Sequence, residues 1–176
     1  MGVFCSFILM RQQIIIDSEV MQLSLPKGAR KLNQQEYNDF MAKRYDKSGI
    51  VDFHNHVYQK DNLLIYYFNS YVTAPKLKKS LESNERIMVG VFKQYSKTIV
   101  VDTAEIITVN NIRFGLIKYH ENDIWHIRFT SDYDNNLHYI RGFIEYKKSD
   151  QAEAEQYLKE LLKSMHFRNE DTMGKP

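Results

Sequence analysis

Two closely spaced histidines form the pattern in this chain that is best suited to metal chemistry. His54 and His56 lie two residues apart, and Asp52 precedes them by the same interval. Side chains two residues apart share one face of a β-strand, and two imidazoles with a carboxylate can begin a zinc-type site. Further ligands would come from later predicted strands: His120, His126 and His138. The alternative interpretation is the solvated polar face of an edge strand.

Two arginines in the second half of the chain suggest an anion-binding surface. Arg128 and Arg141 fall in consecutive predicted strands, so their guanidinium groups can meet on one face of a sheet. Guanidinium groups bind carboxylates and phosphates through paired hydrogen bonds. The structural alternative is that both arginines pair across strands with Glu145 or Glu105.

The chain is also rich in tyrosine, with twelve in 176 residues. Tyrosine is common at protein interfaces, and Tyr133 and Tyr139 flank the turn between the two arginine-bearing strands. A recognition surface is therefore predicted from four residues: Arg128, Arg141, Tyr133 and Tyr139. The alternative is that the tyrosines cover the sheet and keep only their hydroxyl groups in water.

Signatures of catalysis are missing from the sequence. It contains no phosphate-binding loop, Rossmann fingerprint, Gly-x-Ser-x-Gly elbow or CxxC pair. Its one cysteine, Cys5, rules out an intrachain disulfide and has no histidine near it in the sequence to act as a base. The sequence therefore predicts a protein that is not an enzyme and needs no cofactor.

Charge and hydropathy narrow the class of partner. Basic and acidic residues number 24 and 22, for a net charge of +2, and they are interspersed. A nucleic-acid binder usually carries a basic stripe, so nucleic acid is not expected as a partner. No apolar run reaches the length of a membrane span. The expected partner is another protein, and the oligomeric state stays open.

The chain is expected to form one domain over residues 12–168, because 176 residues suffice for one substantial core. Residues 1–11 are apolar, and two interpretations remain open: a truncated export signal, which would place the protein in the cell envelope, or a disordered N-terminus. Residues 169–176 are polar and are predicted to fray.

Hydrophobic periodicity and turn residues predict the elements of the first half. Asn33 and Glu36 form a capping-box pattern at the start of a helix that ends near Tyr45. Pro75 can open a second helix, which Ser83-Asn84 would interrupt. The expected elements are strands within 12–17 and 19–25, a helix over 33–45, strands over 51–58 and 63–72, and a helix over 75–95.

The second half is predicted as an antiparallel meander followed by a closing helix. Strands are expected over 98–109, 112–119, 124–131 and 137–146, with a tight turn at Asn110-Asn111. The helix over 150–165 should be capped by Asp150 with Glu153, and its apolar stripe comprises Tyr157, Leu158, Leu161, Leu162 and Met165. The predicted fold class is α+β: a twisted, mainly antiparallel sheet with helices on both faces.

This order of elements resembles the PsbP-like superfamily of α/β/α sandwiches, which includes photosystem PsbP proteins, DcrB-like lipoproteins and Ran-binding Mog-type proteins. The resemblance rests on Leu25-Pro26-Lys27-Gly28, on Asn110-Asn111-Ile112 with Phe114, and on Ser164-Met165-His166-Phe167. It implies a non-enzymatic binding or assembly-accessory module and supplies no catalytic residues. The lipoprotein signal of DcrB-like members and a recognisable Ran-binding surface are missing, so neither role is transferred. The alternative function is binding of a small ligand or metal at the His54/His56 face.

Overall fold

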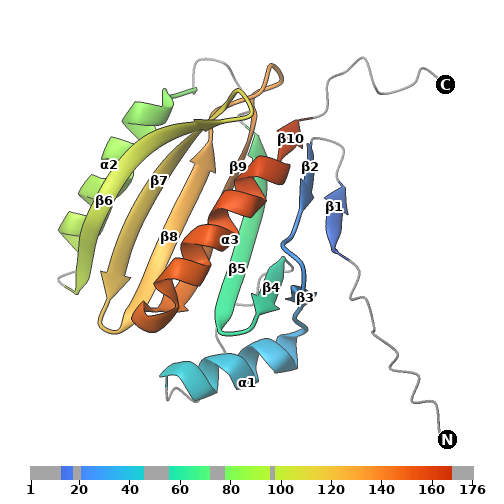
Figure 1. Cartoon of the computed structure of the whole chain (residues 1–176). Helices are drawn as coiled ribbons and strands as arrows, with labels where there is room; N and C mark the ends of the chain where they lie inside the picture. Colours follow the sequence, from blue (N-terminus) through green and yellow to red (C-terminus); the bar gives the residue numbers. More distant parts are fainter. Residues whose placement is uncertain (1–12, 18–20, 46–55, 72–77, 96–97, 168–176) are drawn as a thin grey trace, which may run out of the picture.

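The computed structural model describes residues 13–17, 21–45, 56–71, 78–95 and 98–167 (Figure 1). The strands are β1 (Ile15–Asp17), β2 (Met21–Ser24), β3 (Arg30–Lys31), β4 (Val57–Lys60), β5 (Leu63–Tyr71), β6 (Ile99–Val109), β7 (Ile112–Glu121), β8 (Ile124–Ser131), β9 (His138–Lys147) and β10 (His166–Phe167). The helices are α1 (Gln34–Tyr45), α2 (Leu81–Tyr95) and α3 (Gln151–Ser164), the last preceded by a 3₁₀ turn at Lys148–Asp150.

Two antiparallel sheets organise these elements. The larger has seven strands in the order β3-β4-β5-β9-β8-β7-β6, and the smaller has three in the order β1-β2-β10. All the strand pairs among the described residues are antiparallel. The predicted α+β class with a mainly antiparallel sheet is therefore confirmed.

The turns of the meander follow from local residue chemistry. Asn110 and Asn111 have φ values of 50° and 63°, the left-handed pair that a tight hairpin needs and that asparagine tolerates. The next turn is shorter than predicted: β7 runs to Glu121, and Asn122, with φ of 52°, makes the reversal. This hairpin is tight because β7 and β8 stay paired up to Glu121 and Ile124.

Helix α3 covers one face of the large sheet and carries the main core. The predicted stripe is buried throughout, with Met165 and Leu161 at 0% and 1% exposure. It packs with Phe114, Ile127 and Ile144 of the sheet, and the same cluster includes residues of β2. Figure 1 shows α3 lying diagonally across the sheet with the small sheet beside it.

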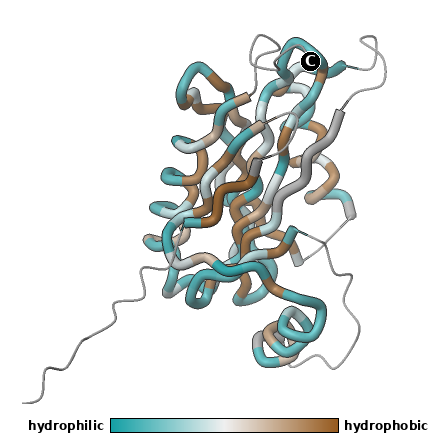
Figure 2. The backbone as a smooth tube through the Cα atoms, turned by 90° about the vertical axis from the view of Figure 1, so that its right-hand side faces the viewer, coloured by the Kyte–Doolittle hydropathy of each residue, from teal (hydrophilic) through white to brown (hydrophobic). Residues whose placement is uncertain are grey.

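Helices α1 and α2 lie on the opposite face. Phe114 belongs to the core beneath α3, whereas a side-chain atom at the next residue, Gly115, would run into Glu85 of α2. Successive residues of a strand face opposite ways, so α2 and α3 sandwich the sheet. The same alternation along β5 puts Leu64 in a second cluster with Tyr37 of α1. Phe40 and Met41 of α1 also pack against this cluster, and most of the other residues of the helix are hydrophilic (Figure 2).

The start of α1 is capped as the sequence predicts. The Glu36 backbone N–H donates to Asn33 Oδ1 at 2.9 Å, and the Asn33 N–H donates to Glu36 Oε2 at 2.9 Å. These reciprocal bonds satisfy two amides that a helix start leaves without partners. Leu32, which precedes the cap, packs with Tyr37 in the α1 cluster.

The predicted start and break of the mid-chain helix are wrong. Helix α2 is continuous over Leu81–Tyr95 and begins after Ser80, whose Oγ accepts a hydrogen bond from the Ser83 N–H at 3.2 Å. Ser83 and Asn84 therefore belong to the first turn, where polar residues are tolerated, and they do not interrupt the helix. Pro75 lies outside the described residues.

The predicted cap of the closing helix is also wrong. Asp150 makes no side-chain cap hydrogen bond, and its φ of −101° and ψ of 11° continue the preceding 3₁₀ turn. Glu153 instead accepts a hydrogen bond from Lys60 Nζ at 2.9 Å. The 3₁₀ turn already supplies a partner for the Gln151 N–H, which bonds the Lys148 carbonyl.

An ion pair anchors α3 to the sheet and should make docking sensitive to pH. Lys118 Nζ lies 2.8 Å from Glu155 Oε1, and this hydrogen bond, followed by one from Gln151, lowers the pKa of Glu155 below its ordinary 4.5. A lowered folded-state pKa means that the stabilisation is complete above pH 4.5 and is lost as pH falls through the folded value.

We expect Glu155→Gln to lower the free energy of unfolding at pH 7 by less than about 1 kcal/mol, because the pair is partly exposed. The melting temperature should fall slightly. The difference from the wild type should shrink as the pH falls below 4.5 and the carboxyl group is protonated, as thermal melts followed by circular dichroism across pH would show. A gap that persists unchanged in acid would mean that packing, and not charge, accounts for the effect.

The Ser164-Met165-His166-Phe167 motif acts as a clasp between α3 and the small sheet. Ser164 Oγ accepts from the Ser24 N–H at 2.9 Å and contacts the carbonyl oxygens of Ser24 and Leu161 at 2.9 and 2.8 Å. Met165 is fully buried, and Phe167 packs against the main core. The motif therefore joins the last helix to a strand 140 residues earlier.

Replacing Ser164 by alanine should lower the free energy of unfolding by about 1–2 kcal/mol, because the Ser24 amide loses its partner in a partly buried place. Urea denaturation would measure the loss. Lys163→Ala, one residue earlier on the exposed side of the same turn, is the control and should change stability little. Equal effects of the two substitutions would rule out the clasp.

Candidate functional site

A pocket lies between α1 and the end of the sheet where β9 leads into α3. It encloses about 670 Å³. Its lining is Arg30, Glu36, Asp39, Phe40, Lys43, Gln59, Asn62, Lys147, Ser149 and Asp150. Cations and carboxylates are equally represented, so the pocket has the character of a site for a small polar or zwitterionic molecule.

Several of the charges in this pocket are already engaged. Arg30 donates to Glu36 Oε1 at 2.5 Å and to Gln59 Oε1 at 2.8 Å. The backbone amide of Asn33, and then the same arginine hydrogen bond, lower the pKa of Glu36. Asp150 differs, because its Oδ2 atom is buried and has no hydrogen-bond partner among the described residues. Asp150 is therefore the carboxylate of this pocket whose hydrogen bonding is incomplete.

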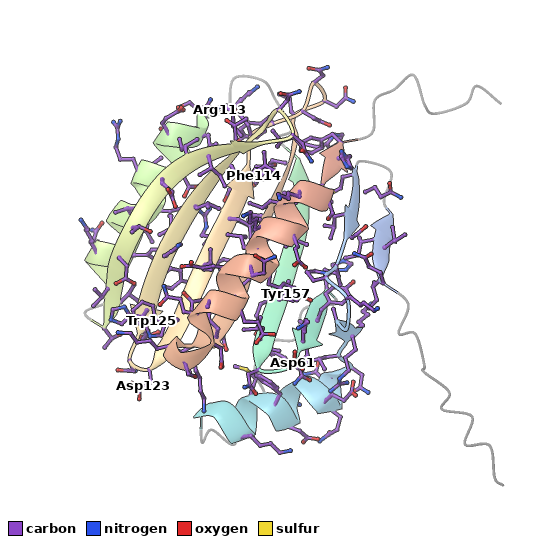
Figure 3. The ribbon with its side chains drawn as sticks, viewed as in Figure 1. Asp61, Arg113, Phe114, Asp123, Trp125 and Tyr157 are labelled. Carbon is purple, nitrogen blue, oxygen red and sulfur yellow. The ribbon has the colours of Figure 1, made fainter. Side chains whose placement is uncertain are left out.

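A smaller hollow of about 460 Å³ lies at the sheet end where β7 turns into β8. His120 stacks on Trp125 with ring centroids 4.4 Å apart, and Lys148 Nζ lies 5.0 Å from the Trp125 ring centroid. His120 Nδ1 is also 3.1 Å from Asp102 Oδ2. Figure 3 shows Asp123 and Trp125 together at this end of the sheet. The hollow offers an aromatic wall rimmed by cations.

Of the two histidines predicted to start a metal site, the structure describes only His56. His54 lies outside the described residues. His56 is exposed in a turn, and β4 begins only at Val57. Partial desolvation, and then the nearby Lys31 ammonium, lower the pKa of His56. Strand β4 runs on to Lys60, beyond the predicted end at Tyr58, because the Asp61-Asn62 hairpin pairs Val57–Lys60 with β5, and residues 51–55 of the predicted strand lie outside the described residues.

The part of the chain that the structure describes contains no group of three or more His, Cys, Asp or Glu side chains that could hold a metal ion. The further ligands that the sequence suggested are engaged elsewhere. His120 contacts Asp102, and His138 Nδ1 lies 3.2 Å from Asp134 Oδ2. A metal site at His54 and His56 therefore stays a prediction.

The two arginines lie on adjacent strands and on one face of the sheet, as the sequence predicts. In the register of β8 with β9, Thr130 is opposite Arg141 and Arg128 is opposite Phe143. Their environments differ, however: Arg141 is exposed, whereas Arg128 is 5% exposed. Arg128 therefore does not belong to an exposed surface, which corrects that part of the prediction; a binding surface at Arg141, Tyr133 and Tyr139 stays a prediction.

Arg128 is held by a residue that sequence reasoning missed. Its Nη1 atom donates to both carboxylate oxygens of Glu85, at 2.9 and 3.0 Å, and Glu85 is 6% exposed. The sequence suggested Glu145 or Glu105 as the partner, but the carboxylate comes from α2. Gly115 was the available signal, since an isolated glycine inside a strand marks the close approach of another group. Here the group that approaches is the Glu85 side chain.

Tyr119 and His126 continue this buried polar layer beneath α2. Their rings stack with centroids 4.7 Å apart, and the centroid of the Phe92 ring of α2 lies 4.6 Å from that of Tyr119. His126 Nδ1 is 4.0 Å from Glu145 Oε2 on the neighbouring strand. Burial, and then the Glu145 carboxylate, raise the pKa of Tyr119 to about 12. The phenol therefore stays protonated at neutral pH and cannot serve as a base there.

The two predicted surface tyrosines do come together. The rings of Tyr133 and Tyr139 meet edge to face with centroids 5.2 Å apart, and both are half-buried. Lys78 Nζ lies 5.2 Å from the Tyr133 ring centroid, and Asn84 Nδ2 donates to the Tyr133 hydroxyl at 3.3 Å. The cluster joins the β8–β9 turn to the start of α2, and Arg141 lies on the same strand face as Tyr139.

Comparison with known proteins places the fold. No protein-family model and no curated protein matches the sequence. The structure superposes on the solution structure of cyanobacterial PsbP (CyanoP) from Synechocystis sp. PCC 6803 with a TM-score of 0.56 and 12% sequence identity. The match covers 93% of this chain and 97% of that chain. None of the described helices is long and apolar enough to cross a membrane.

Proposed function

This chain has a PsbP-like fold, and from that premise we propose that it is a non-enzymatic accessory module that binds another protein. The observation that carries the proposal is the outer edge of the large sheet. Strand β6 is the last strand in the order and pairs with β7 alone among the described strands. Thr103, Ala104 and Glu105 are all exposed, so both faces of the strand meet solvent at its centre. An open edge of this kind is suited to recognising a protein.

Much of the charged side-chain chemistry of the chain serves the fold, which agrees with this proposal. Arg128 neutralises Glu85 inside the sandwich, and Lys118 ties α3 to the sheet. Arg113 joins β7 to Glu82 of α2. The surface residues that remain available, such as Lys78 with the two half-buried tyrosines, suit contact with a protein better than a covalent step.

Affinity capture from an extract of the organism that encodes the chain tests the proposed function. The tagged full chain should reproducibly enrich a small number of proteins, identified by quantitative mass spectrometry, and excess untagged chain should compete them away. A chain carrying a core substitution that unfolds it serves as the background control. If no protein is competed by the native chain across growth conditions, the proposed function is wrong.

A second candidate is binding of a small polar ligand, which the 670 Å³ pocket beside α1 favours. Asp150→Asn should then abolish the thermal stabilisation that a cell-extract metabolite fraction gives the wild type. Lys79→Gln, on the exposed segment before α2, is the matched control.

The metal alternative has its own test. Zinc titration of the wild type and of a His54→Ala/His56→Ala variant should show affinity that depends on both histidines. Equal, weak binding by the two chains would remove the metal site.

A further inference from the structure

The outer edge of β6 has the features of a docking strand. The strand is 11 residues long, and eight of them are β-branched. Its register with β7 is regular except for a bulge between Val101 and Thr103. Beyond the bulge, Thr103–Val109 is a continuous strand with one edge open among the described residues. Figure 1 shows β6 outermost in the sheet, with α3 lying away from it.

Helix α2 packs along β6 (Figure 1), but the strand itself lacks the sequence features that commonly prevent pairing with another chain. Exposed edge strands are commonly protected by lysine, by proline or by bulges along their length. Strand β6 contains neither lysine, arginine nor proline. Its one bulge lies near the beginning and leaves the longer, regular part unprotected. Alternate backbone N–H and C=O groups of that part point outward, ready to accept a further strand.

The charges on β6 indicate the chemistry of the incoming strand. Its two charged residues are both acidic, Asp102 and Glu105. Asp102 lies 3.1 Å from His120, but Glu105 is exposed and has no ion-pair partner among the described residues. Val100, which is 50% exposed, precedes Glu105 along the strand, and Ile107, which is partly buried against the main core, follows it. Both residues are apolar. A second copy would bring further carboxylates to this edge and no cation.

We propose that β6 binds an extended segment of a partner protein by strand addition, with a basic side chain opposite Glu105 and apolar or β-branched residues around it. The proposal rests on the protein-binding function proposed above and names its site and the class of segment recognised. Backbone hydrogen bonds to Thr103–Val109 supply affinity, and the pairing with Glu105 selects the segment and its register.

A labelled peptide tests the edge directly. The probe is fluorescein-Thr-Val-Thr-Lys-Val-Thr-Val-amide, and fluorescence anisotropy measures its binding to the full chain. One matched peptide has glutamate in place of lysine, and another has N-methyl groups on alternate residues. The lysine peptide should bind, whereas both matched peptides should bind at least about tenfold more weakly. Equal binding of the N-methylated peptide would overturn strand addition.

Charge reversal in the protein gives the complementary test. Glu105→Lys should weaken the lysine peptide about tenfold and improve the glutamate peptide, since opposed charges across strands attract and like charges repel. Glu160→Lys, the same charge change on an exposed residue of α3, should leave both affinities unchanged. Sedimentation velocity adds a third readout: a dimer that Glu105→Lys alters would assign the edge to a second copy and overturn the proposal.

Different results would contradict strand addition at β6 and the proposed binding of a partner protein. If the Glu105→Lys chain captures the same host protein as the wild type and in the same amount, partner binding stands but β6 is not its site. If the captured protein is lost with Glu105→Lys and retained with Glu160→Lys, and the lysine peptide competes for it, the strand-addition proposal is supported.

Discussion

Replacing Glu85 by alanine should lower the free energy of unfolding by about 3–5 kcal/mol, the largest effect expected from a single polar side chain here. Glu85 and Arg128 are 6% and 5% exposed, and two short contacts join them between α2 and the sheet. Removing the Glu85 carboxylate would leave the buried Arg128 guanidinium without its ion-pair partner. Urea denaturation at neutral pH, followed by circular dichroism, would give the difference.

Two controls separate this charge effect from lost packing. The double variant Glu85→Leu/Arg128→Met should recover most of the stability, because apolar residues of similar volume can replace a buried pair at little cost. The pair of Arg30 with Glu36, in which both side chains are exposed, is the comparison, and Glu36→Gln should reduce stability far less than Glu85→Ala does. A Glu85→Ala loss as small as that of Glu36→Gln would contradict the buried pair.

Substituting Gly142 by alanine should be similarly damaging, with a loss of about 3 kcal/mol or more, because added volume in a filled core forces neighbours to move. A Cβ atom at Gly142 would clash with the Phe129 ring and with the backbone carbonyl oxygen of Tyr66. Phe129 is fully buried in the main core, and the carbonyl belongs to the adjacent strand β5. Neither can yield without disturbing the sheet, and denaturant unfolding would report the loss.

Gly90 provides the matched control for this substitution. It lies on the exposed side of α2, and nothing lies within 4 Å of an added Cβ atom. Gly90→Ala should therefore stabilise the chain by about 0.5–1 kcal/mol, because alanine loses less conformational freedom in a helix. Opposite signs for the two glycine-to-alanine changes are expected. A mild effect at Gly142 would mean that β5 and β9 are less closely packed than described.

The sequence by itself determined the elements whose causes are local. The asparagine pair at 110–111 specifies a tight turn, and the reciprocal Asn33/Glu36 bonds specify the start of α1. The stripe ending at Met165 determined which side of α3 would be buried. Each depends on residues within a few positions of one another, so no knowledge of the rest of the chain is needed. The predicted resemblance to PsbP-like proteins is confirmed at the level of the fold.

Tertiary structure alone decided which distant groups meet. Glu85 and Arg128 are 43 residues apart, and nothing in their local sequence distinguishes that pairing from the cross-strand alternatives. The order of strands puts β6 at the sheet edge, where Glu105 faces solvent instead of pairing with an arginine. The pocket beside α1 likewise joins residues from Arg30 to Asp150. Periodicity encodes which face of an element is buried, but strand order and register arise from the packing of the whole core, and these determined the candidate sites.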